Sequence, residues 1–456
     1  MSNKDNPNRI RVGEKMAFGL ANLGNLPIMT LIGSFLLIFY TDIAGIDPAA
    51  VATLFIIARV LDGVNDPIMG FIIDHLPKSK MGRFRPYLLI GVIVCSINYL
   101  LLWFGPIMFP GIKLVIVYIT YLLIGISFDM MDIPLNSLLP VMTSDMKERA
   151  SLSTIKGACI MAGSIIVMSV GPLVLKGFGG GFAGYAALIV GGTVVALAFS
   201  IIGVLGVKER VQPIEEEKYK IKDVIPMLLQ RPVLTTFLTV LIYSIGTTGS
   251  SSVNIFFATY ILDNKLEVLS VVGLIQMLTM FIGMFIGQKL TNKLGKKALY
   301  SGTFILAGAA GLIRLLAVTS VPLYYISAVI VGISGGAMMT NAFAIQADNI
   351  DYIEYKKGIR AEGALASLNS FVAKAAGGIG GAIPGYVLAA TGYVAHQEQS
   401  PSARLGIIAV TIIVPAVFTV IAGIIFILGY NINKHKLEEV ITTLKARRDE
   451  KESNKK

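Results

Sequence analysis

The stretch AAVATLFIIARVLDGVNDPIMGFII (residues 49–73) is long enough to cross a bilayer, yet three charged side chains lie near its middle. An ionisable group at the centre of a membrane costs at least ~3 kcal/mol on insertion scales, so such groups usually face a polar cavity and serve transport. Arg59, Asp62 and Asp66 follow one another at spacings of three and four, which places them on one helix face. The stretch therefore predicts a membrane helix that presents a cation beside two carboxylates. A buried structural ion pair is the alternative.

The composition of the whole chain agrees with a membrane protein. Of its 456 residues 54% are hydrophobic and only 15% are charged, and the mean hydropathy is +0.72. These values are typical of a polytopic membrane protein and exclude a set of soluble domains. We expect an all-α protein with twelve transmembrane helices, at about 16–42, 49–75, 86–108, 113–141, 153–175, 183–206, 233–262, 267–290, 298–319, 321–347, 362–391 and 404–430.

The distribution of positive charge predicts the orientation in the membrane. The net charge is +11, but most Lys and Arg residues fall in the segments on one side of the predicted helices. The opposite side holds only Lys113, Lys176, Lys265 and Arg404. This is the positive-inside pattern, so we expect a multi-pass protein of the plasma (inner) membrane with both termini in the cytoplasm. The positive charge is thus explained without nucleic acid.

The chain divides into two halves. A hydrophilic segment at 207–232 separates a six-helix half (1–206) from a second six-helix half (233–430), and a basic tail (431–456) follows. Gly70 and Gly287, which are 217 positions apart, each precede a basic loop after the second helix of their half. Two similar halves of this kind resemble the major facilitator superfamily, whose halves rock around a central cavity.

The charged cluster is confined to the first half. At the same offset of 217 residues, Gln276, Thr279 and Gly283 stand where Arg59, Asp62 and Asp66 stand. If these charged residues served only helix packing, similar residues would be expected at the equivalent positions of both halves. The asymmetry therefore favours a cation site.

A second acidic pair lies in the predicted fourth helix. Asp129 and Asp132 share a helix face, and Asn136 follows one turn further on. Pro134 removes a backbone hydrogen bond and favours a kink or break that would free carbonyl oxygens. Carboxylates from two helices could bind Na⁺, whereas an acid held protonated by burial would bind H⁺. The alternative is that these acids merely pair with Arg59 or Lys156.

Further charges suggest coupling and gating. Lys374 in the eleventh predicted helix could sense the bound cation or donate to substrate, with snorkelling to the interface as the alternative. Lys156, near the start of the fifth predicted helix, could bind the substrate, or it could act in gating or at the membrane interface. The predicted loop after the tenth helix carries Asp348, Asp351, Glu354 and Arg360, which could form salt bridges between the halves that close an inner gate, with a solvated loop as the alternative. The tail could form a helix at Lys434–Arg448 that lies on the anionic inner leaflet.

Enzyme chemistry finds no support in the sequence. His75, His396 and His435 are scattered without metal-ligand spacing, and the glycine-rich segment at 176–185 lacks the lysine–serine pair of a phosphate-binding loop. We expect no cofactor, and no metal beyond a possible Na⁺ as the coupling ion.

Five strings resemble the glycoside–pentoside–hexuronide:cation symporter family. They are FYTDIAG (39–45), ARVLDGVNDPIMGFIID (58–74), GRFRPYLLIG (82–91), MDIPLNSLLP (131–140) and DYIEYKKGIRAEG (351–363). The resemblance implies that Asp62 and Asp66 bind the coupling cation and that Asp132 contributes to cation and sugar binding. It further implies that Lys374 lies near the cation site and that Lys156 lies at the sugar site or inner gate. Arg59 matches the arginine of the second helix.

The departures from the family pattern concern the sugar. Leu26 and Asn136 replace a sugar-binding aspartate and a sugar-stacking tryptophan, Phe128 replaces a tyrosine, and Asp129 replaces a cation-site threonine. We therefore expect a Na⁺- or H⁺-coupled symporter for a sugar, glycoside, pentoside or hexuronide that functions as a monomer. A carrier of a non-sugar solute such as a lysophospholipid-like amphiphile is the second hypothesis, and a membrane sugar sensor without transport is the third.

Overall fold

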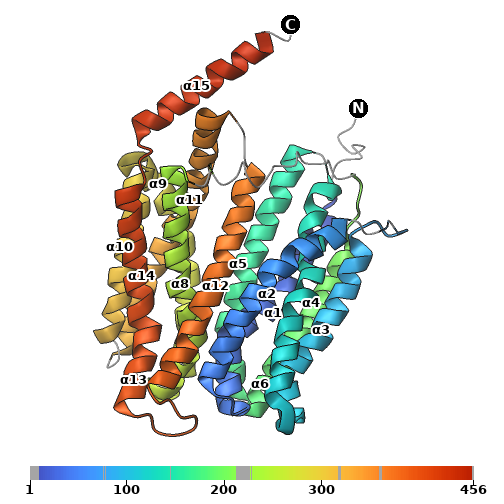
Figure 1. The fold of residues 1–456 in the computed structure, drawn as a ribbon, viewed down its shortest axis with the longest axis vertical. Coiled ribbons are helices and arrows are strands. Elements are labelled where there is room, and N and C mark those ends of the chain that lie inside the picture. The colour runs from blue at the N-terminus through green and yellow to red at the C-terminus, as the bar shows by residue number, and fades with distance from the viewer. Residues whose placement is uncertain are drawn as a thin grey trace. The chain divides into compact units, whose positions relative to one another are not determined.

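The computed structural model of the chain describes residues 10–74, 77, 79–143, 145–211, 226, 229–316, 320–358 and 362–453 (Figure 1). In this part of the chain the secondary structure is helical, with one isolated bridge between Ser79 and Gly82. The membrane-spanning helices of the first half are α1 (Val12–Ile38, continued by the π-helical turn Phe39–Ile43), α2 (Pro48–Asp74), α3 (Arg85–Met108), α4 (Lys113–Met142), α5 (Met146–Gly177) and α6 (Phe182–Gly206). Those of the second half are α8 (Arg231–Tyr260), α9 (Leu266–Leu294), α10 (Lys296–Leu316), α11 (Val321–Lys357), α12 (Glu362–Ala390), and α13 (Pro401–Ile408) with α14 (Val414–Gly429).

These helices confirm the predicted all-α membrane fold. Among the described residues, eleven helices are long and apolar enough to cross a membrane. The remaining predicted span, at about 49–75, corresponds to α2, which is helical over 27 residues. The Asp47 carboxylate caps α2 by accepting hydrogen bonds from the backbone N–H groups of Ala49 (2.8 Å) and Ala50 (3.2 Å). The charged stretch is therefore a regular helix that starts at a well-formed cap.

The chain forms two compact units. The first comprises Met1–Glu216 with the short segments Asn264–Ser270 and Leu388–Gln399, and the second comprises the remainder. In the first unit, α1 packs against α5 and α6, α3 packs against α4 and α6, and α2 packs against α4. Small residues allow these helices to approach closely: a Cβ atom added at Gly203 of α6 would stand 2.5 Å from the backbone nitrogen of Ala21 in α1.

The second unit packs around α10. This helix contacts α11 and α14, and α14 also contacts α8. Its core contains a cluster of aromatic rings, in which the centroid of Tyr300 lies 4.9 Å from that of Phe304 and 4.8 Å from that of Phe426. Edge-to-face rings of this kind add to the stabilisation from apolar burial.

The end of α11 corrects one prediction. Asp348, Asp351 and Glu354 were expected in a loop, but α11 continues to Lys357 and ends at Gly358, whose positive φ of 71° terminates the helix. These residues are therefore helical.

The region around Pro134 corrects a second prediction, and the tail confirms one. Helix α4 continues through Pro134 without a break, so the predicted break is wrong, whereas the predicted kink stays a prediction. The tail helix α15 (Lys434–Ser453) buries Val440 and Leu444 in a core cluster that includes Tyr352 of α11. The predicted helix in the tail is thus confirmed. Val440 and Leu444 pack on protein whereas Ile441 is 51% exposed, and attachment of this helix to the inner leaflet stays a prediction.

Substitution of Gly203 tests the packing of α1 on α6. Gly203→Val should lower the free energy of unfolding by about 1–3 kcal/mol, because the added methyl groups have no space beside the backbone of α1. Gly191→Val on the same helix is the matched control, since nothing lies within 4 Å of a Cβ atom there. Unfolding of the two purified variants in detergent measures the difference, and equal stabilities would contradict the described packing.

Candidate functional site

Helices α2 and α4 are held together at three successive levels, which we call the α2–α4 seam. At one level the rings of Phe55 and Tyr121 lie 5.2 Å apart. At the next, Oδ1 of Asp62 lies against Gly125, where a Cβ atom would stand only 2.5 Å away. One turn further, the amide nitrogen of Asn65 donates a 2.8 Å hydrogen bond to Oδ2 of Asp129. The seam therefore brings carboxylates from two helices to neighbouring levels.

The charges in the seam are partly compensated within α2. Nη1 of Arg59 lies 3.1 Å from Oδ2 of Asp62, and the two side chains are 38% and 20% exposed. Asp129 is only 8% exposed, and the Asn65 hydrogen bond offsets part of the cost of its burial. The seam thus contains a half-buried ion pair next to a buried carboxylate.

Asp132 is the centre of a second polar cluster. Its Oδ1 accepts a 2.6 Å hydrogen bond from Asn25 of α1, and its Oδ2 accepts a 2.7 Å hydrogen bond from Asn136 of its own helix. Lys156 of α5 donates in turn to Oδ1 of Asn136. This Asp132 cluster joins three helices of the first unit.

Asn25 carries a buried hydrogen-bond acceptor that a ligand could use. It is 7% exposed, and its Oδ1 is buried without a hydrogen-bond partner among the described residues. A buried acceptor of this kind costs free energy unless a ligand or water donates to it. Asn25 therefore offers an acceptor beside Asp132.

Helix α4 connects the two clusters. Gly125, Asp129, Asp132 and Asn136 follow one another at spacings of four, three and four, so they form one stripe along the helix. One end of the stripe faces α2, and the other contacts α1 and α5.

The structure places the predicted site residues as follows. Arg59, Asp62, Asp129, Asp132, Asn136 and Lys156 lie in these two clusters of the first unit. The side chain of Asp66 lies outside the described part of the structure, as does Arg360. Lys374 is half-buried in α12 of the second unit, and its role beside the acids stays a prediction. Asp351 and Glu354 lie in the last turns of α11, and their gating role also stays a prediction.

Sequence reasoning missed Asn25 and Asn65. Both are amides in otherwise apolar spans, and Asn65 follows Asp62 at a spacing of three. These two signals would have placed both residues on the polar faces of their helices.

The donor set suits a hard monovalent cation or a proton. Carboxylate and amide oxygens are the ligands that hard cations prefer, and a buried carboxylate can instead hold a proton. Among the described side chains, no group of three or more His, Cys, Asp or Glu residues could hold a metal ion together.

Comparison with known proteins identifies the family. The profile of the family described as MFS/sugar transport protein matches residues 17–434. The chain belongs to this family of sugar transporters. Similar proteins include the isoprimeverose transporter of Lactiplantibacillus pentosus, 32% identical over 411 residues that cover 87% of this chain and 84% of the relative. The glucuronide carrier protein homolog of Escherichia coli K12 is 28% identical over 442 residues, which cover 95% of both chains. The predicted resemblance to the glycoside–pentoside–hexuronide symporters is confirmed, and this transporter is not an enzyme.

Solved structures show the same fold at low sequence identity. The nucleoside transporter NupG superposes with a TM-score of 0.63 at 12% identity and covers 92% of this transporter and 100% of the solved chain. A D-xylose–proton symporter superposes with a TM-score of 0.62 at 12% identity, with coverages of 92% and 98%. The major facilitator fold is thereby confirmed.

A double-mutant cycle tests the hydrogen bond across the seam. Asn65→Ala and Asp129→Ala should each destabilise the transporter, and together they should cost less than their sum by about 1.5–3 kcal/mol, the range for hydrogen bonds to charged groups. The free energy of unfolding of the two single variants and the double variant gives this coupling. Effects that add to within about 0.5 kcal/mol would show that the two side chains do not interact.

Proposed function

We propose that the transporter couples inward movement of Na⁺ or H⁺ to uptake of a sugar, and that the carboxylates of the α2–α4 seam bind the coupling cation. The observation that carries the proposal is that Asp62 of α2 and Asp129 of α4 lie at neighbouring levels of the seam within an apolar bundle. Placing an ionised carboxylate inside a membrane span costs free energy, so the presence of these two carboxylates favours a functional role for them.

The arrangement suggests how binding of the cation is transmitted. The cation neutralises Asp62 and Asp66 on α2, and the displaced Arg59 guanidinium then changes the charge balance of the seam. Since α4 carries both the seam and the Asp132 cluster, a small shift of α4 reaches Asn25, Asn136 and Lys156. In this proposal the cation prepares the Asp132 cluster for substrate, and only the loaded or the empty carrier changes its orientation readily.

The Asp132 cluster has hydrogen-bonding groups that suit a polar substrate rich in hydroxyl groups. Asn25 Oδ1 can accept from a hydroxyl group, and the exposed Asn136 and the ammonium group of Lys156 can donate to one. Lys156 can also pair with a carboxylate, as a uronide would require. Among the relatives, the names isoprimeverose transporter and glucuronide carrier describe substrates of these two kinds, so we propose a glycoside or a uronide.

Uptake into vesicles tests the coupling. A panel of radiolabelled glycosides, pentosides and uronates is offered to proteoliposomes with an imposed Na⁺ gradient, an imposed H⁺ gradient, or neither. We expect accumulation above equilibrium with one gradient, and we expect Asp62→Asn and Asp66→Asn to reduce it to the level of empty vesicles. Asp47→Asn is the matched control on the same helix, because asparagine caps a helix as well as aspartate does.

The same experiment separates the alternatives. Uptake that only equilibrates and ignores both gradients and both substitutions would show that the aspartates are structural. Transport of a lysophospholipid-like amphiphile without any sugar would favour the second hypothesis, and saturable sugar binding without uptake would favour a sensor.

Gly125 provides a test that leaves every charge in place. The methyl group of Gly125→Ala would stand 2.5 Å from Oδ1 of Asp62 and must displace that carboxylate. We expect the cation concentration at half-maximal uptake to rise about tenfold, equivalent to ~1.4 kcal/mol of lost binding. Initial rates at graded cation concentrations measure this shift.

Gly157→Ala in α5 is the control for that substitution, since a Cβ atom there meets nothing within 4 Å. If Gly125→Ala leaves the cation concentration at half-maximal uptake unchanged, Asp62 is not part of the cation site.

A further inference from the structure

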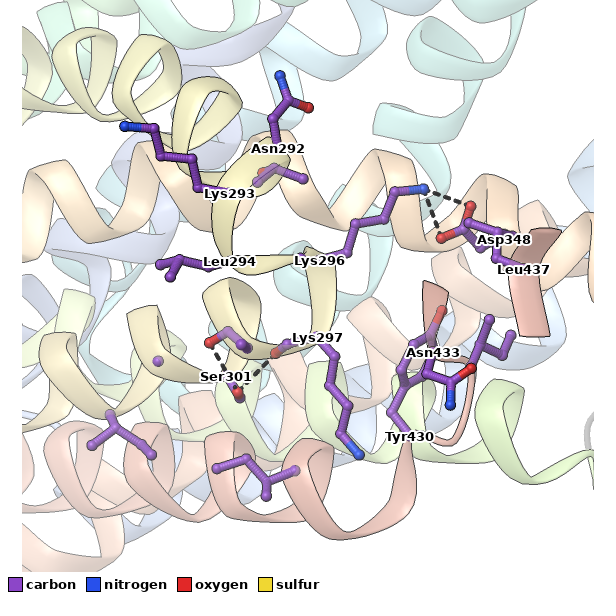
Figure 2. Close-up of a pocket in the computed structure, with 17 residues that line it drawn as sticks. Asn292, Lys293, Leu294, Lys296, Lys297, Ser301, Asp348, Tyr430, Asn433 and Leu437 are labelled. Carbon is purple, nitrogen blue, oxygen red and sulfur yellow. Dashed lines mark hydrogen bonds and ion pairs between the residues drawn. The ribbon is translucent and has the colours of Figure 1, made fainter. Parts of the chain in front are cut away.

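A cavity of about 980 Å³ lies at the end of the second unit that the charge distribution assigns to the cytoplasm. Figure 2 shows its walls, which come from the junction of α9 and α10, from Asp348 of α11, and from the segment that joins α14 to α15. None of these residues belongs to the two clusters of the first unit, so the cavity is a separate feature of the transporter.

The cavity is positively charged. Its charged lining residues are Lys293, Lys296, Lys297 and Asp348, which gives a net charge of +2. The Lys296 ammonium group is neutralised by Asp348, with both carboxylate oxygens at 2.7 Å. Lys293 and Lys297 form no ion pair with the described residues. In Figure 2, Lys297 extends toward the wall formed by Tyr430 and Asn433, whereas Lys293 points away from them.

Tyr430 places an unused hydrogen-bonding group in the same wall. It is 1% exposed, and its hydroxyl group is buried without a hydrogen-bond partner among the described residues. Its ring is fixed by stacking on Phe426 at a centroid distance of 4.5 Å. A buried hydroxyl without a partner costs free energy, so this hydroxyl is available to donate a hydrogen bond to a ligand oxygen.

Asn433 adds a further donor. Its Oδ1 accepts a 2.8 Å hydrogen bond from the backbone N–H of Lys436 and so caps α15. The amide nitrogen of Asn433 therefore remains for a ligand. Helix α10 also begins in this wall, at Lys296, and the positive end of a helix dipole favours an anion. An ammonium group, a phenol and an amide together suit the oxygen atoms of a phosphate.

The rest of the cavity is apolar and leads away along the helices. Leu294, Ile305 and Ile427 line it and are 58%, 37% and 39% exposed. Further exposed apolar side chains continue from them along the adjacent helices α10 and α14: Leu312 on α10, and Ile421 and Ile424 on α14. A free phosphate ion would gain nothing from this surface, whereas the acyl chains of a lipid would cover it.

We propose that this cavity binds the headgroup of an anionic phospholipid of the cytoplasmic leaflet, with Lys297, Tyr430 and Asn433 around the phosphate and the acyl chains against α10 and α14. Basic pockets between helices at the cytoplasmic face are suited to such headgroups. Because Asn433 caps α15, the bound lipid also fixes the start of the tail helix. Tyr355 of α11 holds the same helix by donating a 2.7 Å hydrogen bond to Glu439.

Native mass spectrometry of the full-length protein in detergent tests the proposal. Dioleoyl phosphatidylglycerol is titrated in, with dioleoyl phosphatidylcholine as the zwitterionic comparison. We expect tighter binding of phosphatidylglycerol. We also expect about tenfold weaker binding of this lipid in Lys297→Gln and in Tyr430→Phe, the loss that follows from removing one hydrogen bond to a charged group.

Lys289→Gln is the matched control. This lysine is exposed on α9, one turn before Lys293, and does not line the cavity. It should leave the affinity within about twofold of the unmodified protein. Tyr430→Phe keeps the ring stacked on Phe426, so its melting temperature should stay unchanged and folding should not confound the result.

Three results would overturn the proposal. Equal losses in Lys289→Gln and in the two cavity variants would show that the effect is one of general surface charge. Equal affinities for phosphatidylcholine and phosphatidylglycerol would show an apolar groove without headgroup recognition. Displacement of the lipid by inorganic phosphate at matched concentrations would identify a site for a free anion.

Discussion

A polar group inside a membrane span must find its partner on its own or a neighbouring helix, because the lipid offers none. The α2–α4 seam meets this constraint with the hydrogen bond between Asn65 and Asp129 and the ion pair of Asp62 with Arg59, while Gly125 leaves room for the Asp62 carboxylate. These contacts join α4 to α2, while α3 provides the most extensive packing surface for α4. Since α4 also carries Asp132, the second cluster with α1 and α5 depends on the same helix.

The second unit uses the corresponding positions for packing. Gly283, at the position equivalent to Asp66, has the backbone of Ile333 in contact where a Cβ atom would be. Gly336 of α11 is packed in the same way against the backbone of Met280 in α9. Small residues allow helices to approach closely in a membrane. The two units thus share a helical plan but carry different side chains at these equivalent positions.

Charged segments at the ends of the helices proved more ordered than their composition indicated. Asp348 lies inside α11 and is paired with Lys296, and Val440 and Leu444 of α15 are buried against protein. In both places a charged sequence is helical because a neighbouring helix supplies the partner for its charge or its apolar face. The cavity at Lys297 exists because these elements converge there.

The sequence by itself determined the transmembrane helices and the spacing that puts Arg59 and Asp62 on one face of α2, and Asp129, Asp132 and Asn136 on one face of α4. Hydropathy and the helical period fix these properties locally. Only the tertiary structure decided the partners: Asn65 for Asp129, Asn25 for Asp132, and Gly125 beside Asp62. Such contacts depend on the rotation and register of one helix against another, and these are set by the packing of side chains from distant parts of the chain.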